Sequence, residues 1–137
     1  MSLARVLVAG AVGGFASVFS SWLVTGTVFH RYQRLTPETW RPEGPTQYAL
    51  SSLLLVLAGV AVGLLFYLTG GPLGGDGHAW VARGLLFGSV VWLAAACPIH
   101  LMNAIYVRLH RGVTIGLLLD SLVGLLLIGV ACAWAAR

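Results

Sequence analysis

The chain has 137 residues, of which 58% are hydrophobic and 9% are charged, and its formal net charge at pH 7 is +4. This composition supplies too little polar surface for a water-soluble globule, so we expect the lipid bilayer to surround the protein. The positive charge does not indicate nucleic-acid binding, because the sequence has no long basic patch with interleaved aromatic residues.

Four apolar runs follow one another along the chain, at about residues 6–29, 47–69, 80–106 and 113–134. Each has about 20 residues or more, the length that an α-helix needs to cross a membrane. Only short loops connect them, and we therefore expect one transmembrane domain over residues 1–137. The predicted fold class is an all-α membrane protein, a four-transmembrane-helix bundle of two antiparallel hairpins.

The first loop, residues 30–46, contains signals for a short helix of its own. Thr36 is a residue type that caps helices, and Pro37 favours a first helical turn. Trp40 follows, and tryptophan concentrates at the boundary between lipid and water. We expect a short interfacial helix in this loop.

Arginines divide unequally between the two ends of the predicted bundle. The first and third loops hold five and the side of the termini holds three: Arg31, Arg34, Arg41, Arg108 and Arg111 against Arg5, Arg83 and Arg137. The positive-inside bias therefore predicts cytoplasmic loops at 30–46 and 107–112 and termini outside, in a multi-pass protein of a bacterial cytoplasmic (inner) membrane. The glycine-rich second loop, residues 70–78, is expected to be a flexible outer link.

Glycines are spaced for close packing of the helices in the half of the bundle nearer the termini. Pairs separated by three residues remove side-chain bulk from one stripe of a helix and let two backbones approach. The pairs are Gly10 with Gly14, Gly59 with Gly63, and Gly84 with Gly88.

Asp120 lies within the fourth apolar run, where an ionised carboxylate has a high free-energy cost unless another group pairs with it. The best partner is His100, because the two residues flank the short third loop at similar distances. At ~1.5 Å per residue, both side chains lie roughly 9 to 11 Å below the same membrane surface. We expect a His–Asp polar layer, either structural or one step of a proton relay.

Other polar residues fall at similar depths, in the half of the bundle away from the termini. The predicted polar layer or ligand-binding set is Ser20, Ser21, Thr25, Ser51, Ser52, Cys97, His100, Asn103, Asp120 and Ser121. These residues could line a cytoplasm-facing vestibule. Alternatively, the hydroxyls bond to carbonyls of their own helices and no cavity exists. Both interpretations remain open.

The segment Cys97-Pro98-Ile99-His100 contains the side chains best suited to bind a metal or act as a nucleophile. Pro98 predicts a kink, because its ring conflicts with the carbonyl near Ala94. Cys97, His100 and Asp120 form a candidate metal site with thiolate, imidazole and carboxylate ligands. His100 could also activate Cys97 as a nucleophile, but the sequence shows no oxyanion hole, and we expect a protein that is not an enzyme.

A haem held between His30 and His100 is a further redox alternative. His30 is close to the membrane surface and His100 is deeper, which disfavours this ligand pair. No cofactor is preferred on these residues.

Two stretches resemble a family of small bacterial four-helix membrane proteins catalogued as a domain of unknown function. One is the segment from Gly84 to Gly88, followed by a tryptophan-containing span, the Arg108–Arg111 turn and Ile115–Asp120. The other is the end of the first span, Val28–Tyr32, which precedes a tryptophan. The resemblance covers most of the chain, departs from the family at Cys97–His100, and implies a four-span bundle without an activity.

Two classes of function follow from the sequence. In the first, the bundle packs with copies of itself or with larger membrane subunits around the His–Asp layer. Its contact surface would comprise the glycine stripes with Trp22, Trp92 and Trp134. In the second, it is a proton-coupled or small-molecule-binding membrane protein whose pocket is lined by Asp120, His100 and Asn103.

Overall fold

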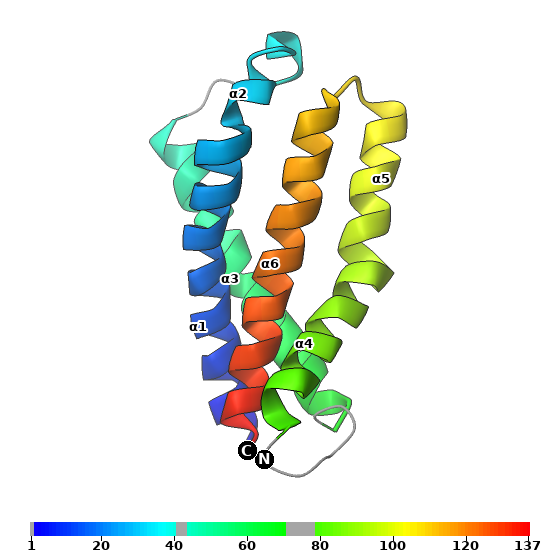
Figure 1. Ribbon diagram of the computed structural model, residues 1–137. Helices are drawn as coiled ribbons and strands as arrows, with labels where there is room; N and C mark the ends of the chain where they lie inside the picture. The colour runs from blue at the N-terminus through cyan, green and yellow to red at the C-terminus, as the bar shows by residue number, and fades with distance from the viewer. Residues whose placement is uncertain (1, 41–43, 71–78) are drawn as a thin grey trace.

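The computed structural model describes residues 2–40, 44–70 and 79–137, and every regular element in these ranges is helical. Four helices there are long and apolar enough to cross a membrane: Leu3–Gln33, Pro45–Leu68, Trp80–Tyr106 and Arg111–Ala135. The protein is thus an all-helical chain of the multi-pass membrane type. Consecutive long helices run in opposite directions, and both termini lie at one end (Figure 1). We call this the terminal end and the other the loop end.

The first span continues four residues beyond its predicted end and contains three kinds of helical segment. α1 (Leu3–Ser21) leads into η1 (Trp22–Phe29), a π-helical stretch, and then into α2 (His30–Gln33). One 3-10 turn, η2 (Pro37–Thr39), follows in the first loop. π-Helical turns are rare and occur frequently at functional sites.

The second span is α3 (Pro45–Leu68), which begins with a proline at its first turn, as that residue's fixed φ favours. It ends before Gly70, whose φ of 76° is a left-handed conformation that glycine adopts without a steric cost. Arg41 and most of the predicted flexible link, residues 71–78, lie outside the described residues.

The third span is divided where proline conflicts with the preceding turn. α4 (Trp80–Val91) is followed by the π-helical segment η4 (Trp92–Ala96) and by α5 (Cys97–Tyr106). Pro98 lies in the first turn of α5, and the carbonyl of Ala94 that its ring would meet belongs to η4. The wider π-helical turn accommodates the proline.

The fourth span, α6 (Arg111–Ala135), starts with a side-chain cap. His110 Nδ1 accepts a hydrogen bond of 3.0 Å from the backbone N–H of Gly112. The ring of Tyr32, in α2, stacks on this histidine with centroids 5.0 Å apart, which joins the end of the first span to the start of α6.

Glycines set how closely the helices approach at the terminal end. A Cβ on Gly14 would lie 2.6 Å from the carbonyl oxygen of Leu55, and one on Gly84 would lie 2.6 Å from Cα of Val130. Gly10 likewise faces Gly59 and Gly63, and Gly88 faces α6. The paired glycines are thus used inside the chain, where α1 packs on α3 and α4 packs on α6.

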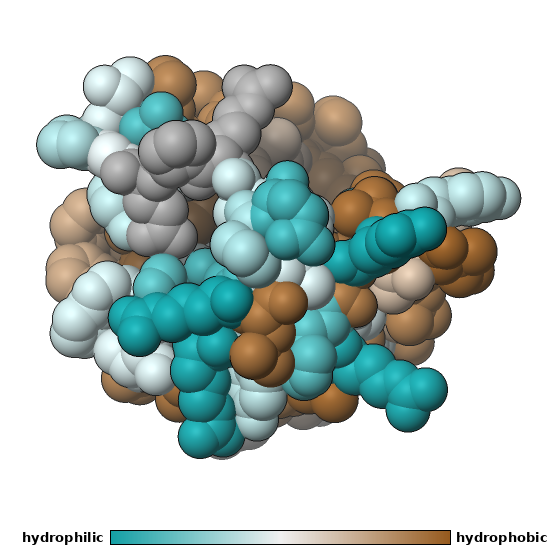
Figure 2. Space-filling view, turned by 90° about the horizontal axis from the view of Figure 1, so that it is seen from above, coloured by the Kyte–Doolittle hydropathy of each residue, from teal (hydrophilic) through white to brown (hydrophobic). Residues whose placement is uncertain are grey.

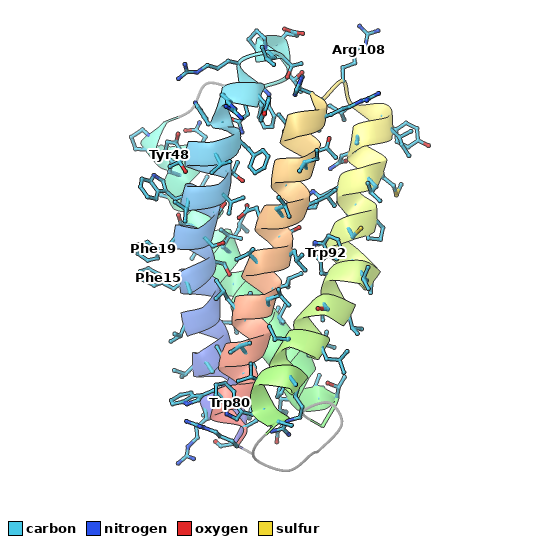
Figure 3. The ribbon with its side chains drawn as sticks, in the orientation of Figure 1. Phe15, Phe19, Tyr48, Trp80, Trp92 and Arg108 are labelled. Atoms are coloured by element: carbon cyan, nitrogen blue, oxygen red, sulfur yellow. The ribbon has the colours of Figure 1, made fainter. Side chains whose placement is uncertain are left out.

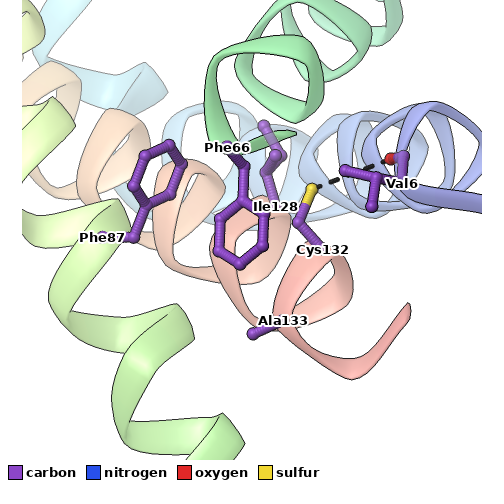
Figure 4. Packing of buried hydrophobic residues seen from close by; sticks show 6 residues of the cluster. All are labelled: Val6, Phe66, Phe87, Ile128, Cys132 and Ala133. Atoms are coloured by element: carbon purple, nitrogen blue, oxygen red, sulfur yellow. Dashed lines mark hydrogen bonds between the residues drawn. The ribbon is translucent and has the colours of Figure 1, made fainter. Parts of the chain in front are cut away.

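A small hydrophobic core lies among these contacts, in the same half of the molecule (Figure 4). It comprises Val6, Phe66, Phe87, Ile128, Cys132 and Ala133. The rings of Phe66 and Phe87 meet edge to face with centroids 5.0 Å apart, which ties α3 to α4. Ser17 is buried beside this core, and its hydroxyl donates to the carbonyl of Gly124 at 3.2 Å, linking α1 to α6.

The outer surface is divided between apolar and polar regions. Phe15 and Phe19 point away from the helices and are 58% and 61% exposed, as expected for side chains in contact with lipid (Figure 3). Viewed from the loop end, hydrophilic side chains gather over the end face and hydrophobic ones surround it (Figure 2). The tight glycine packing and the small core therefore lie in the half nearer the terminal end, and the face of the loop end is polar.

Candidate functional site

A groove that is lined by both apolar and hydrogen-bonding side chains lies between the first and second spans, toward the loop end. Its volume is about 960 Å³. We call it the polar groove, and it is lined by Val18, Phe19, Ser21, Trp22, Thr25, Gly26, His30, Gln33, Tyr48, Ser51, Ser52 and Leu55. It brings together four of the predicted polar residues, those at positions 21, 25, 51 and 52.

The lining changes character along the helices. Val18, Phe19 and Leu55 form its deeper part and offer only apolar contacts. Hydroxyl groups follow at the level of the π-helical segment η1. His30, Gln33 and Tyr48 lie at the mouth, next to the first loop. An amphipathic molecule would find an apolar environment below and hydrogen-bonding groups above.

Asp120 lies behind this groove. Its Oδ2 accepts a hydrogen bond of 2.8 Å from the hydroxyl of Ser21, which comes from α1. Hydrogen bonds to a carboxylate are among the stronger ones in proteins. Thr25 is within electrostatic range of the carboxylate, although its buried hydroxyl makes no hydrogen bond. Ser21 therefore connects the buried acid of α6 to the groove.

The direct pairing predicted between His100 and Asp120 is not present. The imidazole is close enough to the carboxylate for their charges to interact, but no hydrogen bond or ion pair joins these two described side chains. The buried Nδ1 of His100 has no hydrogen-bond partner. Counting residues from the third loop predicted that His100 and Asp120 lie at the same depth. Asp120 nevertheless forms its hydrogen bond with α1, because α5, which carries His100, makes few contacts with α6.

The remaining predicted polar residues do not share one vestibule. Asn103 is exposed and Cys97 is half-buried, both on α5, and neither lines the polar groove. The hydroxyl of Ser20 is buried without a partner. Ser121 donates to the carbonyl of Leu118 at 3.1 Å, as the alternative without a cavity predicts for this residue. The predicted polar residues are thus divided: Ser21, Thr25, Ser51 and Ser52 line the groove between the first two spans, and the other six do not.

The candidate metal site also lacks the required arrangement. Cys97, His100 and Asp120 do not gather, and in the described ranges no three His, Cys, Asp or Glu residues lie close enough together to hold a metal ion. Both cysteines are free thiols. Of the two histidines considered for haem, His30 lines the polar groove and His100 does not.

Trp92, which one of the two function classes includes in a contact surface for partners, forms hydrogen bonds within the bundle. Its side chain points toward α6 (Figure 3), where Nε1 donates to Ser121 Oγ at 3.0 Å and to the Leu118 carbonyl at 3.1 Å. An indole N–H in the middle of a span needs an acceptor, because lipid offers none. This requirement could have predicted from the sequence that Trp92 bonds within the bundle, with Ser121 as a candidate acceptor.

Association with copies of the chain or with larger subunits stays a prediction. The glycine pairs proposed for it are occupied inside the chain, and Trp92 bonds within the bundle. Trp22 and Trp134 remain exposed, as lipid-facing residues are.

Comparison of the chain with models of protein families, with curated proteins and with solved structures found no match. The resemblance to small four-helix bacterial membrane proteins therefore stays a prediction.

Proposed function

We propose that this membrane protein binds a small amphipathic molecule in the polar groove, and that Asp120 adjusts the electrostatics of the groove through Ser21. The observation that carries the proposal is the 2.8 Å hydrogen bond from Ser21 to Asp120, because it links a costly intramembrane acid to a groove large enough for a ligand.

The hydrogen bonds already formed in the groove favour a ligand that donates hydrogen bonds. A hydroxyl has one donor and two acceptor positions. Ser21 uses its donor on Asp120, and Ser51 uses its donor on the carbonyl of Tyr48 at 3.0 Å. Both oxygens therefore offer acceptors to a bound molecule, with a carboxylate behind one of them. We propose an amphipathic amine or alcohol as the ligand class, with the apolar part against Phe19 and Leu55.

The membrane topology belongs to the same proposal. The loop end carries Arg31, Arg34, Arg108 and Arg111, as a cytoplasmic side does under the positive-inside bias. The groove would then open toward the cytoplasm of a bacterial cell, across its cytoplasmic membrane. The 3-10 turn η2 and the half-buried Trp40 would lie at the membrane surface.

Binding of octylammonium and octyl sulfate to the purified protein tests the proposal, because the two probes share a tail and differ in head-group charge. We expect octylammonium to bind more tightly. Asp120→Asn retains an acceptor for Ser21 and removes the charge. It should therefore lower the affinity for octylammonium about tenfold, ~1.4 kcal/mol, and leave folding intact. Unchanged affinity in this variant would remove Asp120 from the mechanism.

A second pair of variants tests the groove itself. Gly26 lines the groove, and a Cβ there would meet only the Trp22 side chain, at 3.6 Å, so Gly26→Phe fills the space without a backbone clash. Thr27→Phe, at the neighbouring exposed position, is the matched control. We expect lost binding in the first and retained binding in the second. Equal binding by both would locate the ligand elsewhere.

A further inference from the structure

A second groove lies at the terminal end, between α1 and α6. Its volume is about 600 Å³. We call it the basic groove, and it is lined by Ala4, Arg5, Val8, Ala9, Val12, Ala131, Trp134, Ala135 and Arg137. None of these residues lines the polar groove, so an inference from this surface is independent of the proposed function.

The floor of the basic groove is apolar and hollow because small residues occur on both helices. Ala9 of α1 and Ala131 of α6 leave space that the exposed side chains of Val8 and Val12 border. From Arg5 to Val12 the groove runs along eight residues of helix, which are seven steps, or about 10 Å at ~1.5 Å per residue. It thus leads from the end of the bundle into the depth of the bilayer.

Two guanidinium groups flank the mouth. Arg137 lies over the rings of Trp80 and Trp134, at 5.0 and 5.3 Å from their centroids. Stacking of this kind orients a guanidinium and leaves its edge N–H groups free to bind oxygen atoms. Arg5 is exposed on the opposite wall, in the first turn of α1. The two cations border the same groove.

No acidic side chain among the described residues balances this charge. The described acids are Glu38, in η2 at the loop end, and Asp120, which is bonded to Ser21. Among the described side chains, the groove therefore combines two positive charges at its mouth with an apolar channel directly below. A phospholipid has the complementary pattern, a phosphate joined to acyl chains.

We propose that the basic groove is a binding site for an anionic phospholipid. The phosphate would lie between Arg5 and Arg137, and one acyl chain would follow Val8, Val12 and Ala131. A lipid without an ammonium group is favoured because two arginine side chains and no Asp or Glu side chain line the groove. The apolar channel distinguishes this site from one for free phosphate, which would use only the arginines.

Native mass spectrometry of the full chain, with phosphatidylglycerol and phosphatidylethanolamine of identical acyl chains, tests the site. We expect phosphatidylglycerol to bind preferentially. The double variant Arg5→Gln/Arg137→Gln should bind it roughly 30-fold more weakly, the effect of two basic groups near a membrane surface. Arg34→Gln/Arg108→Gln, at two exposed positions of the loop end, removes the same charge and should bind as the unaltered protein does.

Val12→Trp tests the acyl channel separately. Val12 is 60% exposed, so a larger side chain fills the channel without entering the core. Thermal unfolding without added lipid checks that each variant is folded. Loss of phosphatidylglycerol binding by both Val12→Trp and the Arg5/Arg137 variant supports the proposal. Equal loss in the loop-end variant, full binding by Val12→Trp, or equal stabilisation by inorganic phosphate would each overturn it.

Discussion

The contact between α1 and α3 gives the sharpest test of the packing. A methyl group added at Gly14 would lie 2.6 Å from the carbonyl oxygen of Leu55 and 2.9 Å from Cα of Val56. Ordinary contacts of a Cβ begin at 3.4 Å, so the two helices must separate by about 0.8 Å. Both neighbouring atoms belong to the backbone and cannot turn aside as a side chain would.

We predict that Gly14→Ala lowers the free energy of unfolding by about 1–3 kcal/mol relative to Gly26→Ala, the range for an overpacked interior. Gly26→Ala is the matched control, because its methyl would meet only a side-chain atom at 3.6 Å. Both variants replace glycine by alanine within the same helical span, Gly14 in α1 and Gly26 in η1, so the difference between them reports mainly the steric effect. Denaturant unfolding in detergent, followed by circular dichroism, measures it. Equal midpoints for the two variants would refute the close approach of α1 and α3.

Three further predictions concern other contacts. Gly84→Ala should destabilise the protein by a similar ~1–3 kcal/mol, since its methyl would meet backbone atoms of α6; an unaltered unfolding midpoint would contradict this contact. Trp92→Phe should cost about 1 kcal/mol, because Ser121 and the Leu118 carbonyl lose the indole donor; in a Ser121→Ala background the same change should cost less, because only the bond to the Leu118 carbonyl is then lost, and strictly additive losses would argue against the Trp92–Ser121 bond. In the folded protein N-ethylmaleimide should modify the half-buried Cys97 and spare the fully buried Cys132, as intact mass would show, and two adducts at equal rates would contradict the burial of the second thiol.

Composition and hydropathy were enough to predict the four spans, because the need to satisfy backbone polar groups in lipid leaves few other solutions. The ends of the helices were predicted less well. The first span extends to Gln33, four residues past the predicted end, because polar residues continue the helix beyond the apolar run. The π-helical segments could not be anticipated, since a shift in the hydrogen-bond register depends on the surrounding contacts.

The candidate site was predicted in composition but not in arrangement. Counting residues from a loop gives the depth of a side chain, but not the direction in which it points around its helix. His100 and Asp120 were matched in depth, yet the acid bonds to Ser21 of the first span. The glycine pattern similarly predicted close approaches without identifying which helices meet. The polar groove required the pairing of the first two spans, which no sequence motif specified.

The backbone contacts between the glycines of α1 and α3 lie in the half of the bundle nearer the terminal end, whereas the loop end of the first span is held against α6, where a Cβ on Gly112 or Gly116 would lie within 3 Å of the rings of Tyr32 and Phe29. α3 can therefore pivot at its glycine contacts while its other end moves relative to the first span. From Gly59 to Pro45 α3 extends about 21 Å, so a tilt of about 5° displaces its far end by about 2 Å. Such a tilt would leave the basic groove, which α1 and α6 form, nearly unaltered in width and would widen or narrow the polar one, so molecules of different girth could occupy the same pair of helices.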